Sequence, residues 1–180
     1  MLRLFFALQP ALEQSVGIVG QVAPLVTRLQ AQRVPPENLH ATLCFIGSVA
    51  EERLEALTSL AAKTRGREVT LRFDTLEHWR KPRVLCATAS DDSASSPARE
   101  LAAQLGLAAV AAGFTPDIKP FRAHLTLARK IDARRAHDEW PRPLSPPFRM
   151  HCDRFVLMRS DRAESGSIYS VVASWPLDVA

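Results

Sequence analysis

The sequence predicts an α+β fold of mostly antiparallel sheet with flanking helices, in a single domain of 180 residues. Strand-like and helix-like segments follow one another irregularly, without the strand–helix–strand alternation of a parallel sheet. Two strand-like segments, residues 69–79 and 83–89, are joined by the short polar stretch RKP, which indicates a hairpin. The tetrapeptides HATL at residues 40–43 and HLTL at residues 124–127 occur one in each half of the chain and indicate two related lobes.

The elements before this hairpin follow from hydrophobic periodicity and from proline positions. An apolar, aromatic run at residues 2–9 predicts a buried strand that ends before a proline. A helical pattern then continues to about residue 33, and Pro24 within it predicts a kink or an early end. Residues 38–47 form the next apolar segment, a strand that ends at a glycine. Residues 51–64 have apolar side chains at helical spacing and acidic residues in the first turn, where a helix favours them.

The second half begins with a polar, serine-rich stretch, SDDSASSP, at residues 90–97, which we take as the approximate midpoint between the two lobes. An alanine- and leucine-rich helix at residues 98–112 follows, with Gly113 as its C-cap. The remaining expected segments are a strand at residues 121–129, a polar and proline-rich loop at 130–147, and strands at 148–159 and 168–177.

Composition and charge exclude several classes of protein. Hydrophobic residues make up 47% of the chain and charged residues 23%, so the chain can bury a core and is not disordered. The net charge of +4 favours an anionic partner without identifying it. Three cysteines, an odd number spread widely, exclude a disulfide framework and a cysteine-based zinc site. The N-terminal apolar run is too short for a signal peptide and no run reaches the roughly 18 residues of a membrane helix, so we expect a cytoplasmic protein that does not bind membranes.

The two His-x-Thr tetrapeptides place polar side chains on one face of otherwise apolar strands. Residues two apart in a strand share a face, so His40 lies beside Thr42, and His124 lies beside Thr126. A single such pair is often structural, but one pair in each half of the chain favours a shared catalytic site. Metal ligation is a further alternative, which would require a third or fourth ligand, and the sequence contains no HExxH or H-x-H motif.

These motifs also carry a family resemblance. The segments NLHATLCFIG and FRAHLTLAR, together with RLFFALQP near the N-terminus, resemble the two-histidine (2H) phosphoesterase superfamily. Within it, the chain is most similar to the RNA 2′,3′-cyclic phosphodiesterases, also called 2′-5′ RNA ligase-like proteins. The resemblance covers the whole chain, and the two HxTx tetrapeptides are its specific part. It implies a bilobal fold in which two pseudo-symmetric lobes form a cleft, with one HxTx strand on each side.

The resemblance further implies hydrolysis of an RNA-terminal 2′,3′-cyclic phosphate to a 2′-phosphomonoester without metal or cofactor, with reversible 2′-5′ RNA ligation as a related activity. It makes His40 the proton donor and His124 the proton acceptor. The chemistry needs such a pair, because a base takes a proton from water while an acid protonates the leaving ribose oxygen. Imidazole, with a pKa of about 6.5, supplies both forms near neutral pH. The hydroxyls of Thr42 and Thr126 can donate to the non-bridging phosphate oxygens.

Other residues have competing interpretations. Strict alternation places Arg129 on the face opposite His124, whereas the resemblance favours a role in binding the phosphate. Phe5 and Phe6 can either stack on a base or belong to the core. Cys44 shares the alternation face of His40, so it is expected either to border the cleft or to be a small buried residue. No role is assigned to Tyr169, the only tyrosine.

The expected partner is RNA with a 2′,3′-cyclic phosphate end, tRNA fragments included, and the expected state is a monomer. A non-catalytic module that binds RNA ends is the alternative outside the enzymes. Within the enzymes, the alternative is a phosphodiesterase that acts on small cyclic nucleotides or on ADP-ribose cyclic phosphate. Turnover of a cyclic-phosphate substrate separates the first alternative from the enzymes, and the preferred substrate separates the second.

Overall fold

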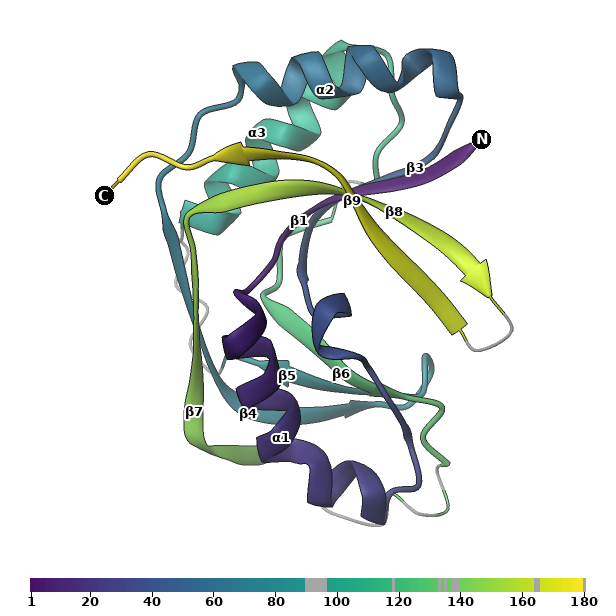
Figure 1. Cartoon of the computed structure of the whole chain (residues 1–180), viewed down its shortest axis with the longest axis vertical. Coiled ribbons are helices and arrows are strands. Elements are labelled where there is room, and N and C mark those ends of the chain that lie inside the picture. The colour runs from purple at the N-terminus through teal and green to yellow at the C-terminus, as the bar shows by residue number, and fades with distance from the viewer. Residues whose placement is uncertain are drawn as a thin grey trace.

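The computed structural model describes residues 1–89, 97–117, 119–132, 134, 136, 140–163 and 166–179. It confirms the α+β class, with two antiparallel sheets and flanking helices (Figure 1). Sheet A has the strand order β3 (Ala41–Val49), β1 (Leu2–Leu8), β8 (Arg154–Ala163) and β9 (Gly166–Pro176). Sheet B has the order β2 (Gln32–Arg33), β6 (His124–Arg129), β5 (Val84–Thr88), β4 (Val69–Trp79) and β7 (Arg142–Cys152).

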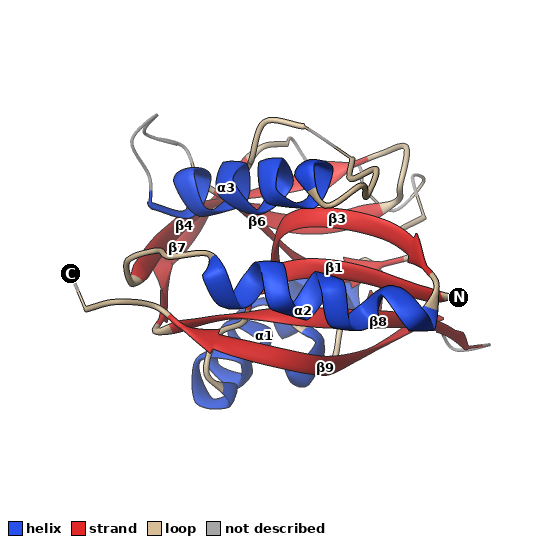
Figure 2. Cartoon of the chain, turned by 90° about the horizontal axis from the view of Figure 1, so that it is seen from above, coloured by secondary structure: helices blue, strands red, loops and turns tan. Residues whose placement is uncertain are grey.

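Each sheet is covered by its own helices. Helix α1 (Leu12–Arg28) packs against β2 and β6 of sheet B. Helix α3 (Pro97–Ala111) packs against β3 of sheet A, and α2 (Leu54–Lys63) packs against α3 and β9. Figure 2 shows α2 over β1 and β8 of sheet A, with α3 next to β3. The two lobes are therefore a sheet with two helices and a sheet with one.

Both lobes contain strands from each half of the sequence. Sheet A combines β1 and β3 from the first half with β8 and β9 from the second, and sheet B is mixed in the same way. The two lobes are therefore not two successive stretches of the chain. Residues 90–96, which cover most of the predicted midpoint, lie outside the described residues.

The expected loop at residues 130–147 is partly wrong, because strand β7 already begins at Arg142. Its prolines hid it, since proline cannot donate to a ladder hydrogen bond. The strand tolerates them because β7 lies at the edge of sheet B. The expected single strand at residues 148–159 is also wrong. The strand is interrupted at Asp153, where the chain passes from β7 in sheet B to β8 in sheet A.

Helix α1 continues through Pro24 and ends at Arg28, earlier than the expected residue 33. Ile18, Val22 and Val26 are all buried, so the apolar stripe continues on both sides of the proline. Burial of this stripe compensates for the backbone hydrogen bond that Pro24 cannot donate. The expected C-cap of α3 is confirmed: Gly113 has a φ of +76°, and the following N–H of Phe114 donates to the carbonyl oxygen of Ala109.

Two clusters of buried side chains lie on opposite faces of sheet A. The large core contains Phe6 and Phe155 and extends into both lobes. The small cluster consists of Phe5, Ala7, Val156 and Met158, against which Phe45 and Tyr169 pack. Because neighbouring residues of β1 point to opposite faces, Phe5 and Phe6 belong to different clusters. Residues of this small cluster and its neighbours, among them Phe5 and Tyr169, also line the cleft described in the next section.

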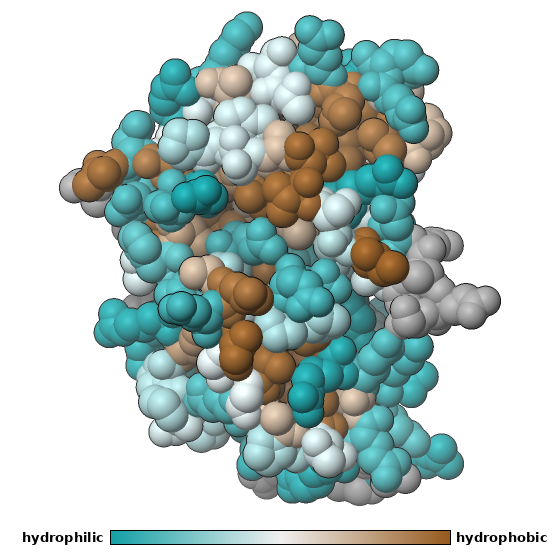
Figure 3. Space-filling model, in the orientation of Figure 1, coloured by the Kyte–Doolittle hydropathy of each residue, from teal (hydrophilic) through white to brown (hydrophobic). Residues whose placement is uncertain are grey.

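The molecular surface in Figure 3 mixes hydrophilic side chains with separate apolar patches. Exposed apolar side chains include Leu12 and Val16 of α1 and Ile168 and Val171 of β9. None of the helices in the described part of the chain is long and apolar enough to cross a membrane.

Candidate functional site

The two His-x-Thr segments meet in one cleft. His40 directly precedes β3 of sheet A, and His124 is the first residue of β6 in sheet B. These two strands contact each other although they belong to different sheets. The cleft between them has a volume of about 400 Å³. Its lining residues are Arg3, Phe5, His40, Thr42, Phe45, His124, Thr126, Arg129, Ser160, Ser167 and Tyr169.

Both imidazoles are held in the same way. Nδ1 of His40 lies 2.7 Å from the carbonyl oxygen of Asn38, and Nδ1 of His124 lies 2.9 Å from the carbonyl oxygen of Arg122. A carbonyl oxygen can only accept, so in each ring Nδ1 carries the proton and donates. Nε2 of each neutral ring is then the nitrogen that can exchange a proton with a ligand in the cleft.

The surroundings of His40 are aromatic and positively charged. The rings of Phe5 and Tyr169 each lie 4.9 Å from the imidazole, centroid to centroid. Burial lowers the pKa of His40 to about 4, and the positive charges of Arg129 and His124 act in the same direction. The hydrogen bond to Asn38 opposes this shift without reversing it. His40 is therefore neutral at pH 7 in the ligand-free protein.

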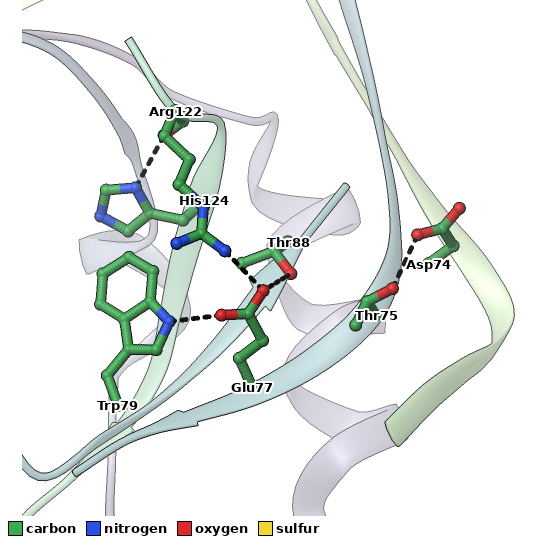
Figure 4. Close-up of polar contacts among 7 residues, drawn as sticks. All are labelled: Asp74, Thr75, Glu77, Trp79, Thr88, Arg122 and His124. Atoms are coloured by element: carbon green, nitrogen blue, oxygen red, sulfur yellow. Dashed lines mark hydrogen bonds and ion pairs between the residues drawn. The ribbon is translucent and has the colours of Figure 1, made fainter. Parts of the chain in front are cut away.

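The surroundings of His124 include a carboxylate. The ring of Trp79 lies 4.8 Å from the imidazole, and the indole N–H of this tryptophan donates to the carboxylate of Glu77 (Figure 4). Burial lowers the pKa of His124, and the positive charge of Arg122 adds to this effect. The hydrogen bond to the Arg122 carbonyl and the charge of Glu77 both oppose it. The two histidines thus share a backbone contact but differ in the charges around them.

A β-bulge follows the threonine of each motif. In the pairing of β1 with β3, Phe6 lies opposite Cys44 and Ala7 opposite Thr42, so Leu43 is an extra residue. In the pairing of β5 with β6, Leu85 lies opposite Ala128 and Cys86 opposite Thr126, so Leu127 is extra. An extra residue reverses the alternation beyond it.

The bulges explain two departures from strict alternation. Arg129 faces the cleft with His124, and its guanidinium donates to the Tyr169 hydroxyl at 3.2 Å. Cys44 is turned away from His40. It is buried next to α3, where it lines a separate apolar pocket with Leu43 and Gly106. Of the two interpretations of Cys44, the small buried residue is the correct one.

The two phenylalanines considered for base stacking have different positions. Phe6 is fully buried in the large core against Phe155 and Trp175, so the stacking interpretation is wrong for it. Phe5 lines the cleft, but only 3% of it is exposed. Its ring packs against the imidazole of His40 and therefore has little free surface for a ligand.

Several cleft residues were missed from the sequence. Arg3 could have been found, because it lies two positions before Phe5 on β1 and shares its face. Phe45 could not, because the bulge at Leu43 brings it to the cleft, where the guanidinium of Arg3 lies 4.9 Å from its ring centre. Ser160 and Ser167 reach the cleft from β8 and β9, which pair with each other, and no local pattern places these strands in the same sheet as β3.

The other histidines do not join the site. His78 and His151 do not line the cleft, and His151 instead contacts Thr70 and Glu68. His137 lies outside the described residues. Among the residues that the structure does describe, no group of three His, Cys, Asp or Glu side chains could hold a metal ion.

Comparison with known proteins places this arrangement in a family. The 2′-5′ RNA ligase superfamily model matches residues 13–164. The chain belongs to this superfamily. The resemblance inferred from the two HxTx segments is thereby confirmed.

Named relatives from the superfamily cover nearly the whole chain. The RNA 2′,3′-cyclic phosphodiesterase of Escherichia coli strain K12 is 30% identical, over 97% of this chain and 96% of that protein. The protein of the same name from Thermus thermophilus is 28% identical over 98% of this chain and 90% of that protein. The crystal structure of E. coli LigT in its apo form superimposes with a TM-score of 0.84 at 28% identity, and it covers 98% of both chains. A structure of E. coli LigT complexed with 3′-AMP has a TM-score of 0.83 at 28% identity, again over 98% of both chains.

Proposed function

We propose that this protein opens RNA-terminal 2′,3′-cyclic phosphates to 2′-phosphomonoesters, with His40 as general acid and His124 as general base. The observation that carries the proposal is the matched pair of imidazoles in one cleft, each fixed through Nδ1 so that Nε2 is available. A site that only binds phosphate has no need of two such groups. The names of the two curated relatives support the same activity.

The reaction needs no group beyond these side chains and water. Nε2 of His124 accepts a proton from a water molecule as the water oxygen attacks phosphorus. The bond from phosphorus to the ribose O3′ breaks on the opposite side, and O3′ takes the proton from Nε2 of His40. The product carries its phosphate on O2′, His124 ends protonated and His40 ends neutral. Proton exchange with solvent restores the starting state. The same ring opening, with the 5′-hydroxyl of a second RNA end attacking phosphorus in place of water, gives a 2′-5′ linkage.

The threonines are placed to hold the phosphate during this step. Thr42 and Thr126 line the cleft beside the two histidines, one from each sheet. Their hydroxyls can donate to the two non-bridging oxygens, where negative charge increases in the transition state. The guanidinium of Arg129 adds a fork of donors from β6, the strand that also carries Thr126.

The initial charge state follows from substrate binding. One histidine must start protonated, whereas burial lowers both pKa values in the ligand-free protein. A cyclic phosphate brings a negative charge into the cleft, which raises the pKa of a neighbouring imidazole. We therefore expect the substrate to be bound together with a proton.

The cleft also fits a nucleotide. Its volume of about 400 Å³ is in the range of small-molecule sites. Phe45 is half-buried at its wall and offers an aromatic ring to a base, as single-stranded RNA sites commonly do. Arg3, next to Phe45, and Arg129, on the opposite wall, give the cleft the positive charge that a phosphate chain requires.

The test is turnover on a substrate panel after dialysis against EDTA. An RNA oligonucleotide ending in a 2′,3′-cyclic phosphate, 2′,3′-cyclic AMP and ADP-ribose cyclic phosphate are each incubated with the protein. We expect the oligonucleotide to be opened and EDTA to leave the rate unchanged. Binding of the oligonucleotide without turnover would indicate a non-catalytic module. Faster opening of the small substrates would identify them as the preferred substrates. Loss of turnover in EDTA that zinc restores would indicate a metal enzyme.

A further inference from the structure

The carboxylate of Glu77 on β4 accepts three hydrogen bonds from side chains around His124 (Figure 4). Its Oε2 accepts from the indole N–H of Trp79 at 2.7 Å. Its Oε1 accepts from the hydroxyl of Thr88 at 2.9 Å and from the guanidinium of Arg122 at 2.6 Å. Burial raises the pKa of Glu77, but these three donors together lower it below its ordinary value, so the group is ionised at neutral pH.

The three residues that donate to Glu77 are also neighbours of His124. The ring of Trp79 lies 4.8 Å from the imidazole, and Thr88 is the residue directly opposite His124 in the pairing of β5 with β6. The carbonyl oxygen of Arg122 accepts the proton of Nδ1, and its guanidinium lies 5.2 Å from the ring centre of Trp79. Glu77 therefore fixes the side chains that pack around one histidine of the pair, without touching the reacting atoms itself.

His40 has different surroundings. Its neighbours are the rings of Phe5 and Tyr169, and the charges that act on it within the described structure are those of Arg129 and His124. Among the described residues, the charged groups that act on His124 are Arg122 and Glu77, of opposite sign. A carboxylate thus favours the protonated form of one histidine of the pair and not of the other.

We propose that Glu77 is a positioning residue that holds His124 in its reactive orientation and stabilises the imidazolium formed when His124 accepts a proton. This inference rests on the proposed function for its catalytic consequence. Its structural part concerns His124 alone and can be measured without any substrate.

The direct test is NMR titration of the two histidines in the wild-type protein and in Glu77→Gln. Glutamine keeps the shape of the side chain but removes the charge. We expect the pKa of His124 to fall by about half a unit or more, because a carboxylate close to a histidine raises its pKa by about 1–3 units and solvent weakens this effect here. We expect the pKa of His40 to stay where it is.

Glu68→Gln is the matched control. Glu68 also carries a single negative charge, its side chain is 23% exposed against 24% for Glu77, and it lies directly before β4. Its partner is His151, which lies outside the cleft. This control should leave both histidine pKa values and turnover unchanged.

The kinetic test is the pH profile of turnover. In Glu77→Gln the limb that reports deprotonation of His124 should move to lower pH, and kcat should fall about tenfold or more because the imidazolium loses its support. A lower rate with an unmoved limb would indicate a merely structural role and overturn the inference. Glu77→Asp keeps the charge, so it should retain the wild-type limb even if the shorter side chain weakens the three hydrogen bonds.

The outcomes separate this inference from the proposed function. A wild-type protein that opens no cyclic phosphate, yet shows the expected change in the pKa of His124, contradicts the function and leaves the role of Glu77 standing. A wild-type protein that opens the substrate while the His124 pKa is unchanged in Glu77→Gln contradicts the role of Glu77 alone. If Glu77→Gln does not fold, the His124 limb of the pH profile is compared between Glu77→Asp and Trp79→Phe. Both variants keep the carboxylate, so a limb that moves in either of them would overturn the inference. Removal of the indole N–H should slow turnover without moving the limb, since the carboxylate remains.

Discussion

Phe45 and Arg129 occupy equivalent positions on the two walls of the cleft. Each lies five residues after a motif histidine, and a bulge after the motif threonine brings each to the cleft face. The two positions therefore use the same backbone device but carry an aromatic ring on one wall and a guanidinium on the other. This difference breaks the pseudo-symmetry of the site. It suggests that the base of a nucleotide lies toward Phe45 and its phosphate toward Arg129.

Arg129→Ala tests the phosphate side of this arrangement. A hydrogen bond to a charged group contributes about 1.5–3 kcal/mol, so we expect binding of inorganic sulfate or of the product nucleotide to weaken about 10- to 100-fold. Loss of the positive charge should also raise the pKa of His40 above its value of about 4. Calorimetry and NMR titration measure the two effects. Arg159→Ala, which removes a guanidinium paired with Asp161, is the control. Unchanged binding in Arg129→Ala would place Arg129 outside the phosphate site.

Replacing either motif histidine tests the acid–base pair. Loss of one general acid or base costs typically 10²–10⁴-fold in rate, so we expect falls of this order in kcat for His40→Ala and for His124→Ala. The double variant should lose less than the product of the two, because groups that act together are not additive. His151→Ala, which removes a histidine outside the cleft, should keep full activity. A single variant with near-normal kcat and an intact fold would make that histidine structural.

The sequence carried enough to predict the strands and the two His-Thr pairs, because a two-residue period and a repeated motif are local signals. The side-chain directions of Phe45, Cys44 and Arg129 could not be predicted, since each residue follows a bulge that depends on the partner strand and that strict alternation does not anticipate. Strand β7 was hidden for a related reason: its prolines are acceptable only because it is an edge. The hydrogen bonds of Glu77 join residues from strands β4 and β5 and from the segment before β6, and only the folded chain brings them together.

Stability should depend on pH through His40. Its pKa is about 4 in the folded protein and about 6.5 in the unfolded chain, so the unfolded state binds more protons between these values. The contribution of His40 is complete above pH 6.5 and is lost as the pH falls toward 4. At pH 5 the loss is up to about 2 kcal/mol.

Urea unfolding of the wild-type protein and of His40→Gln at pH 7.5 and pH 5 measures this contribution. Glutamine does not titrate, and the carboxylates affect both proteins alike, so the difference isolates His40. We expect the wild type to lose more free energy of unfolding than the variant on acidification. Sulfate should reduce the wild-type loss, because an anion in the cleft favours the protonated imidazole. Parallel declines in both proteins would show that the imidazole is not desolvated in the fold.

The threonines and the direction of ring opening are tested together by the product. If His40 protonates O3′ while His124 activates water on the opposite side, only a 2′-phosphate can form. Thr42→Val and Thr126→Val keep the branched shape of the side chain but remove the hydroxyl donor, and loss of one such donor costs about 10²–10³-fold. The loss should appear mainly in kcat, because these hydrogen bonds strengthen as charge accumulates on the phosphate oxygens. NMR of the product nucleotide identifies the phosphorylated oxygen. A 3′-phosphate from the wild type would show that O2′, and not O3′, is the oxygen that leaves and takes the proton. Full activity in both valine variants would show that the threonines do not hold the phosphate.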